Sequence, residues 1–198
     1  AKIVNCKLKI ENSVLYVSGE ESVEQIKIRA ERLGIKSDNL LLLAETNVDM
    51  ICTQITELNP KIVIIDSVQT IWTEELTGTA GSVGQVRESA ARLLKIGKNK
   101  KISIFLIGHV TKAGAIAGPK VLEHMVDTVL YLEGERFSAA RLLRTTKNRF
   151  GPTDEVGVFE MVDKGLKEVV NPSKLFLKER VKKVPGSVVT ATIEGTRP

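Results

Sequence analysis

Short runs of branched aliphatic residues constrain the fold of this chain more than any other feature of its sequence. Residues 62–65 are four consecutive Ile or Val residues, and residues 102–107 are apolar at all but one position. Strands that are apolar on both faces are typical of parallel sheets covered by helices. The sequence therefore predicts an α/β protein with a buried sheet.

Helical patterns alternate with strands along the first part of the chain. Further strands are expected at 14–17 and 40–43, and helices at 22–33, 47–58 and 82–98. Ser22 and Gln25 form a capping box, Gly34 closes the first helix, and Asn47 begins the second. Because strand and helix alternate four times, we expect a mainly parallel sheet flanked by helices.

The pattern changes after a further strand at 128–132. Residues 141–146 and 156–161 read as strands joined by short turns without a helix between them. We expect these strands to be antiparallel and to lie at one edge of the sheet. Asn171-Pro172-Ser173 marks a boundary. We therefore predict one domain over 1–171, followed at 172–198 by a C-terminal linker and the stub of a truncated domain.

Composition excludes several other classes of protein. The 198 residues are 42% apolar, 27% charged and 4% aromatic, which fits a globular chain with an aliphatic core. No stretch reaches the roughly 18 apolar residues of a membrane-spanning helix, and the first residues lack the layout of a signal peptide. We expect a cytoplasmic protein with no membrane partner.

The two cysteines suggest no chemistry. Cys6 and Cys52 make neither a zinc motif nor a disulfide framework, and we expect both to be buried without a functional role.

The positive charge of the chain is concentrated. The net charge is +5, and the segment from Arg136 to Arg149 holds five basic residues and no acidic one. An acidic partner such as nucleic acid or a nucleotide fits this pattern. A solvated strand face fits it equally well, so charge alone does not decide the function.

Reactive side chains follow three of the predicted strands. Glu20 and Glu21 follow the first, Asp66 ends the third, and His109 follows the fourth. Because ligands bind at the carboxyl ends of parallel strands, we expect these residues to meet at one edge of the sheet. Asp66 is then the candidate ligand for the Mg²⁺ that bridges nucleotide phosphates. Glu20 is the candidate to orient or deprotonate an attacking water.

Each of these residues also has a simpler explanation. Asp often forms turns after strands, acids are favoured at helix starts, and a histidine at a strand end is often a polar cap. The chain contains no Gly-x-x-x-x-Gly-Lys-[Ser/Thr] phosphate-binding loop. We interpret the cluster of Gly78, Gly81 and Gly84 as a mobile loop.

Longer motifs in the sequence narrow the range of protein families that the chain could belong to. They lie at residues 15–22, 64–70, 106–112, 118–124 and 147–151, and the most specific is Lys147-Asn148-Arg149-Phe150-Gly151. Together they resemble the RadA (Sms) family of bacterial DNA repair proteins. The resemblance runs from about Val14 to about Pro172.

The resemblance implies a RecA-like ATPase that forms a hexameric ring, binds single-stranded DNA and drives branch migration of recombination intermediates. ATP, ADP and Mg²⁺ are the implied ligands. Asp66 matches the Walker B acid at the metal and nucleotide, and Glu20 matches the catalytic glutamate. His109 falls in the motif that links the nucleotide to a DNA-binding loop. Lys147 and Arg149 match a charged signature that reaches the nucleotide of the neighbouring subunit as an arginine finger does.

The resemblance also implies two DNA-binding loops, at 73–84 and 112–120. The second loop carries Lys112 and Lys120, which suit phosphate contacts that ignore base sequence. Trp72 either contacts DNA at the edge of the first loop or packs against the core. A recombinase is a further candidate partner.

Complete members of this family begin with a four-cysteine zinc finger and a phosphate-binding loop, and they end in a domain similar to Lon protease. The resemblance therefore implies a fragment in which residues 1–12 are the tail of a helix and zinc belongs only to the absent finger. We expect ATPase activity of the complete protein and inactivity of the fragment alone. The alternative is a non-catalytic RecA-like module for oligomerisation and DNA binding.

Overall fold

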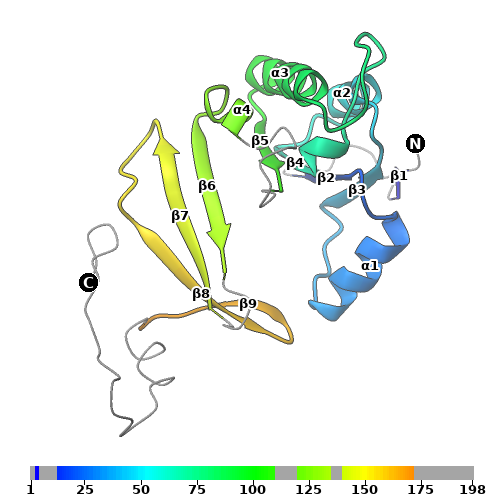
Figure 1. The fold of residues 1–198 in the computed structure, drawn as a ribbon. Helices are drawn as coiled ribbons and strands as arrows, with labels where there is room; N and C mark the ends of the chain where they lie inside the picture. The colour runs from blue at the N-terminus through cyan, green and yellow to red at the C-terminus, as the bar shows by residue number, and fades with distance from the viewer. Residues whose placement is uncertain (1–2, 5–12, 110–119, 135–139, 172–198) are drawn as a thin grey trace, which may run out of the picture. The chain divides into compact units, whose positions relative to one another are not determined.

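The computed structural model describes residues 3–4, 13–109, 120–134 and 140–171 (Figure 1). The chain divides into two compact units, Ala1–Val126 and Asp127–Pro198, and each is treated by itself below. The predicted linker and stub at 172–198 lie outside the described residues, so the domain boundary near 171 stays a prediction.

A five-stranded sheet forms the centre of the first unit, with the strand order β1-β3-β2-β4-β5. The pairs β3-β2, β2-β4 and β4-β5 are all parallel, as the alternation of strands and helices predicts. Its strands are β1 (Ile3–Val4), β2 (Val14–Ser18), β3 (Leu40–Ala44), β4 (Ile62–Asp66) and β5 (Ser103–Ile107).

The expectation that residues 1–12 are the tail of a helix is wrong at Ile3–Val4. These two residues form β1, which pairs antiparallel with Leu42 and Leu43 of β3. The physical reason is that the outer edge of β3 offers unpaired backbone groups, and two branched residues suit a strand that covers them. Residues 5–12 lie outside the described residues.

The expected helices are present. Ser22 and Gln25 exchange hydrogen bonds as a capping box, because the amide of Gln25 donates to Ser22 Oγ and the amide of Ser22 donates to Gln25 Oε1. Asn47 Oδ1 accepts hydrogen bonds from the amides of Asp49 and Met50. The helices are α1 (Val23–Arg32), α2 (Val48–Leu58), α3 (Val83–Lys100) and the short α4 (Lys120–Glu123), with a 3₁₀ turn, η1, at Val68–Thr70.

The main core lies between one face of the sheet and helices α2 and α3. Alternate residues of β2 and β4 point into it, and Leu15, Val17, Val63 and Ile65 are fully buried. The register places Tyr16 beside Ile64 and Phe105 on the opposite face of the sheet. Phe105 on that face is 54% exposed.

The second unit is a four-stranded antiparallel sheet with the order β6-β7-β8-β9. The strands expected at 128–132, 141–146 and 156–161 are present. The expectation that the antiparallel strands lie at one edge of the parallel sheet is wrong, because their backbone groups pair with one another in a sheet of their own. The short last strand was not expected. The bounds are β6 (Thr128–Glu133), β7 (Ala140–Asn148), β8 (Val156–Val162) and β9 (Gly165–Glu168).

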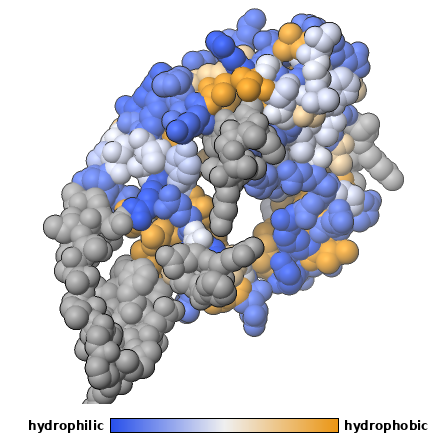
Figure 2. All heavy atoms as spheres, in the orientation of Figure 1, coloured by the Kyte–Doolittle hydropathy of each residue, from blue (hydrophilic) through white to orange (hydrophobic). Residues whose placement is uncertain are grey.

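Hydrophilic residues cover most of the described surface that is visible in Figure 2, with smaller hydrophobic areas between them. Within the described ranges, no helix combines the length and the apolar character needed to cross a bilayer.

Candidate functional site

The carboxyl ends of β2, β4 and β5 lie side by side. Ser18 pairs with Asp66, and Asp66 pairs with Ile107, so all three strands end at the same level. The amide of Gly19 donates to the carbonyl of Asp66 at 2.9 Å, which ties the first two ends together. The structure thus brings the residues that follow these strands to one edge of the sheet.

Glu20 is held from both neighbouring strands. The hydroxyl of Ser67, directly after β4, donates to Glu20 Oε1 at 2.5 Å. Nε2 of His109, after β5, lies 3.4 Å from the same oxygen. The carboxylate and the imidazole are about half exposed, so the pair lies at the surface of this edge. The expected convergence of Glu20 and His109 is therefore seen directly.

Asp66 has a partner that the sequence did not suggest. The phenol of Tyr16, one pleat back on β2, donates a hydrogen bond to Asp66 Oδ2. Burial, together with this hydrogen bond and the charge of Asp66, raises the pKa of Tyr16 to about 12, although Arg29 acts in the opposite direction. The phenol therefore remains a proton donor at neutral pH. Within the described part of the chain, no donor contacts the other oxygen of Asp66, Oδ1.

Gly19 allows the turn after β2 to lie against η1. A Cβ atom at this position would come within 2.0 Å of Thr70 Oγ1 and 2.7 Å of Thr70 Cβ. The hydroxyl of Thr70 in turn donates to the carbonyl of Ser67 at 2.7 Å. The absence of a side chain at Gly19 thus brings Glu20 within reach of Ser67.

Gln69 joins the ends of β4 and β5. Its Nε2 donates to the carbonyl of His109 at 3.1 Å. Its Oε1 is buried and has no hydrogen-bond partner among the described residues. Gln69, Ser67 and Tyr16 are the site residues that sequence reasoning missed. Their only signal was position, within or next to motifs that already contained Glu20 or Asp66.

The oxygen donors at this edge fit magnesium. In nucleotide sites Mg²⁺ takes one or two carboxylates from the protein and completes its octahedron with phosphate oxygens and water. No group of three or more His, Cys, Asp or Glu residues that could hold a metal occurs in the ranges described. Tyr16 donates to Oδ2 of Asp66, and no donor contacts Oδ1 among the described residues. Asp66 therefore fits a nucleotide site in which phosphates and water complete the magnesium coordination, and not a site built from protein ligands alone.

The predicted cations belong to the second unit. Lys147 lies on β7 opposite Val129, and Arg149 follows the end of that strand. Nη1 of Arg149 lies 2.8 Å from Asp127 Oδ1, and its amide donates to the Asp127 carbonyl. Their use at a nucleotide stays a prediction, because in the described residues these contacts lie within the second unit.

The two predicted DNA-binding loops differ in what can be described. Lys112 lies outside the described residues, and Lys120 is exposed at the start of α4. Trp72, before the first loop, donates through its indole N–H to Thr46 Oγ1 at 3.1 Å. Its backbone also bonds to Thr46 and Val48. The structure therefore favours the packed alternative for Trp72.

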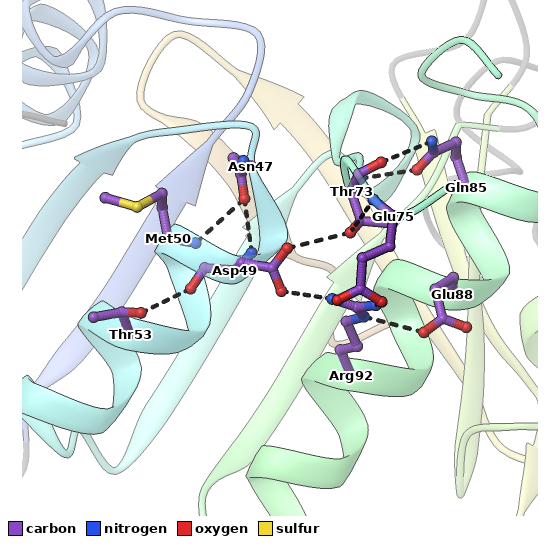
Figure 3. A network of polar contacts seen from close by, with 9 residues as sticks. All are labelled: Asn47, Asp49, Met50, Thr53, Thr73, Glu75, Gln85, Glu88 and Arg92. Carbon is purple, nitrogen blue, oxygen red and sulfur yellow. Dashed lines mark hydrogen bonds and ion pairs between the residues drawn. The ribbon is translucent and has the colours of Figure 1, made fainter. Parts of the chain in front are cut away.

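The first of these two loops is held along its first half, residues 73–78, by a side chain of α3 (Figure 3). Gln85 of α3 is buried, and its side chain accepts from the amide of Thr73 and donates to the carbonyls of Thr73, Leu76 and Gly78. One buried amide thus bonds four backbone groups of residues 73–78. The mobility expected of the cluster of Gly78, Gly81 and Gly84 stays a prediction.

Arg92 of α3 also holds the loop, through an ion pair with Glu75. Its guanidinium bonds Asp49 at the start of α2, Glu75 in the loop and Glu88 one turn earlier on α3 (Figure 3). These hydrogen bonds raise the pKa of Arg92, and burial opposes them only in part. Asp49 also accepts from the Thr73 hydroxyl at 3.2 Å. Helices α2 and α3 and the loop are thus joined through one cation.

The parallel sheet and the polar residues at its carboxyl edge define the class of protein: an α/β protein of the RecA-like type. The fold matches that of a KaiC-like protein from the archaeon Pyrococcus horikoshii, with a TM-score of 0.60. The match covers 80% of this chain and 76% of that chain at 16% identity. The expected fold class is confirmed.

Curated relatives point to a particular protein within that class. The chain is 58% identical over 187 residues to the DNA repair protein RadA of Bacillus subtilis and 56% identical over 196 residues to RadA of Listeria monocytogenes. These matches cover 94% and 98% of this chain but only 41% and 43% of the relatives. The chain is thus a RadA-like sequence, as its motifs predict, and it spans about two fifths of the length of these relatives. No protein-family model matches it.

Proposed function

We propose that this chain is the catalytic part of an ATP-driven DNA-remodelling motor that acts in recombinational repair. The observation that carries the proposal is the convergence of Glu20, Asp66 and His109 at one edge of the parallel sheet. Similarity to proteins named DNA repair protein RadA supports the repair role. The motor would work in the bacterial cytoplasm on single-stranded DNA and on branched recombination intermediates.

Asp66 is the residue that would hold the magnesium of a bound ATP. A magnesium ion held there would supply positive charge that offsets the charge developing on the transferring phosphate. Glu20 orients the attacking water and accepts its proton. Ser67 and His109 both lie against Oε1 of Glu20, which leaves Oε2 to face that water.

The proposed motor hydrolyses ATP between the copies of a hexameric ring. Lys147 and Arg149 act on the nucleotide of the neighbouring copy, where rigidly placed cations stabilise the transferring phosphate and are worth ~10³ or more in rate. Hydrolysis then depends on assembly.

DNA contact is assigned to the loops at 73–84 and 112–120. Lys112 and Lys120 contact phosphates without regard to base sequence. His109, which contacts Glu20, lies shortly before the second loop in the sequence. This arrangement supports a coupling of ATP hydrolysis to DNA binding.

The test is Glu20→Gln in the complete protein. We expect ATP binding to persist and steady-state hydrolysis to fall about 10²–10⁴-fold, because the amide keeps the size of the side chain but cannot take a proton. Glu21→Gln is the matched control, since Glu21 is the adjacent acid and pairs with Arg29 instead. Unchanged hydrolysis in Glu20→Gln would remove this residue from catalysis and favour a non-catalytic module.

A further inference from the structure

The phenol of Tyr16 lies at the centre of this inference. Tyr16 and Ser18 share one face of β2, and Ser18 is the register partner of Asp66, so Tyr16 and Asp66 are diagonal neighbours on one face of the sheet. The reach of a tyrosine ring spans this diagonal and brings its hydroxyl to Asp66 Oδ2. Both residues are partly buried, so water competes less for the contact than it would at an exposed surface.

We propose that Tyr16 is a positioning residue for the metal ligand Asp66: it fixes one carboxylate oxygen so that the other points to the cation. This inference rests on the proposed function, which makes Asp66 the magnesium ligand. Hydrogen-bond partners of metal ligands commonly have this role, and their loss typically costs 10–100-fold in metal affinity.

The surrounding contacts support a role for Tyr16 in orienting Asp66. A carboxylate at the end of a strand can rotate about its side-chain bonds, and each alternative rotamer would aim its oxygens elsewhere. Tyr16 is the one side chain that donates to Asp66 in the hydrogen bonds of the described residues. Glu20, in contrast, is held by Ser67 and His109. The two acids of the site are therefore oriented by separate partners, since neither contact of Glu20 involves Tyr16.

The experiment compares Tyr16→Phe, Asp66→Asn and Tyr131→Phe in the complete protein. Tyr131→Phe is the matched control, because it removes the hydroxyl of the other tyrosine, on β6 of the second unit. Manganese, used in place of magnesium, is titrated by electron paramagnetic resonance in the presence of a non-hydrolysable ATP analogue. The melting temperature of each variant is measured alongside.

We expect Tyr16→Phe to weaken manganese binding about 10-fold or more, Asp66→Asn to weaken it further, and Tyr131→Phe to leave it unchanged. In steady-state hydrolysis, Tyr16→Phe should raise the magnesium concentration for half-maximal rate, and saturating magnesium should restore kcat. A purely structural loss would lower kcat at every magnesium concentration. In the Asp66→Asn background, Tyr16→Phe should have no further effect on metal binding.

The outcomes distinguish a failure of the positioning role of Tyr16 from a failure of the metal-ligand role of Asp66. If Asp66→Asn loses the metal while Tyr16→Phe binds it as tightly as the unchanged protein, the positioning role is overturned and the proposed function stands. If Asp66→Asn itself binds manganese normally, Asp66 is not the metal ligand and the proposed function fails at this residue. A Tyr16→Phe effect that persists unchanged in the Asp66→Asn background would also overturn the inference.

Discussion

At the scale of single residues, the site depends on Gly19, whose missing side chain lets the turn after β2 touch η1. A methyl group there would overlap Thr70, as close as 2.0 Å to its Oγ1. The backbone of the turn is also tied to β4 through the amide of Gly19. The turn therefore has little freedom to move away from an added methyl group.

We accordingly expect Gly19→Ala to destabilise the protein by about 1–3 kcal/mol, the usual cost of forcing atoms into a packed site. Urea or thermal unfolding measures this change. Gly84→Ala is the control, since a Cβ built at Gly84 meets no atom within 4 Å in the described residues beyond its own turn of α3. Equal stability of the two variants would show that the turn after β2 adapts freely.

The residue scale also shows what sequence reasoning could not supply. Glu20, Asp66 and His109 were predicted because each follows a recognisable strand. Tyr16 and Asp66 are 50 positions apart, and Ser67 and Glu20 are 47 apart. Such pairs depend on which residues of two parallel strands lie opposite each other, and the sequence of either strand alone does not specify that register.

At the scale of secondary-structure elements, the loop after Trp72 is held by α3. Gln85→Ala removes the buried amide that bonds four backbone groups of the loop and leaves them unsatisfied. We expect a loss of about 1–3 kcal/mol in stability and faster amide exchange at residues 73–78. Hydrogen exchange followed by mass spectrometry tests this prediction.

Gln54→Ala serves as the comparison for Gln85→Ala. Gln54 lies on α2, and its amide bonds only an exposed Glu57 in the described structure. Amide exchange in the loop should be unchanged in this variant. Protection of 73–78 that survives in Gln85→Ala would mean that Arg92 and Asp49 are sufficient to hold the loop.

The helices and strands were predicted where the residues that define them are close together in the sequence. The capping box of Ser22 and Gln25 and the cap at Asn47 operate within one helical turn, and both are present. The strand β9 (Gly165–Glu168) has only four residues, half of them charged, and is defined by its pairing with β8. The contacts that hold residues 73–78 were not predicted, because the side chains that make them lie on helices α2 and α3 and not in the loop.

At the scale of the whole molecule, the proposed function requires that copies of the chain complete one another's sites. A mixture of Asp66→Asn and Arg149→Ala proteins should then hydrolyse ATP faster than either variant alone. Some interfaces of the mixed ring would pair an intact Asp66 with an intact Arg149. ATP hydrolysis measured across mixing ratios tests this prediction.

Arg144→Ala is the control for the Arg149→Ala mixture. Arg144 lies on β7, the strand that precedes Arg149, and pairs with Glu133 of the neighbouring strand β6. We expect it to retain hydrolysis without a partner variant. If no ratio of the Asp66→Asn and Arg149→Ala proteins recovers activity, Arg149 does not act across an interface.

The contact between Arg149 and Asp127 has a consequence for such a ring. A guanidinium that already has a carboxylate in its own chain is oriented before any neighbour arrives. About half of both side chains is accessible to solvent, and pairs of this kind are typically worth only ~0–1 kcal/mol. A polyphosphate with several negative charges could therefore displace Asp127 at little energetic cost, and Asp127 would recapture the arginine once the phosphate departs.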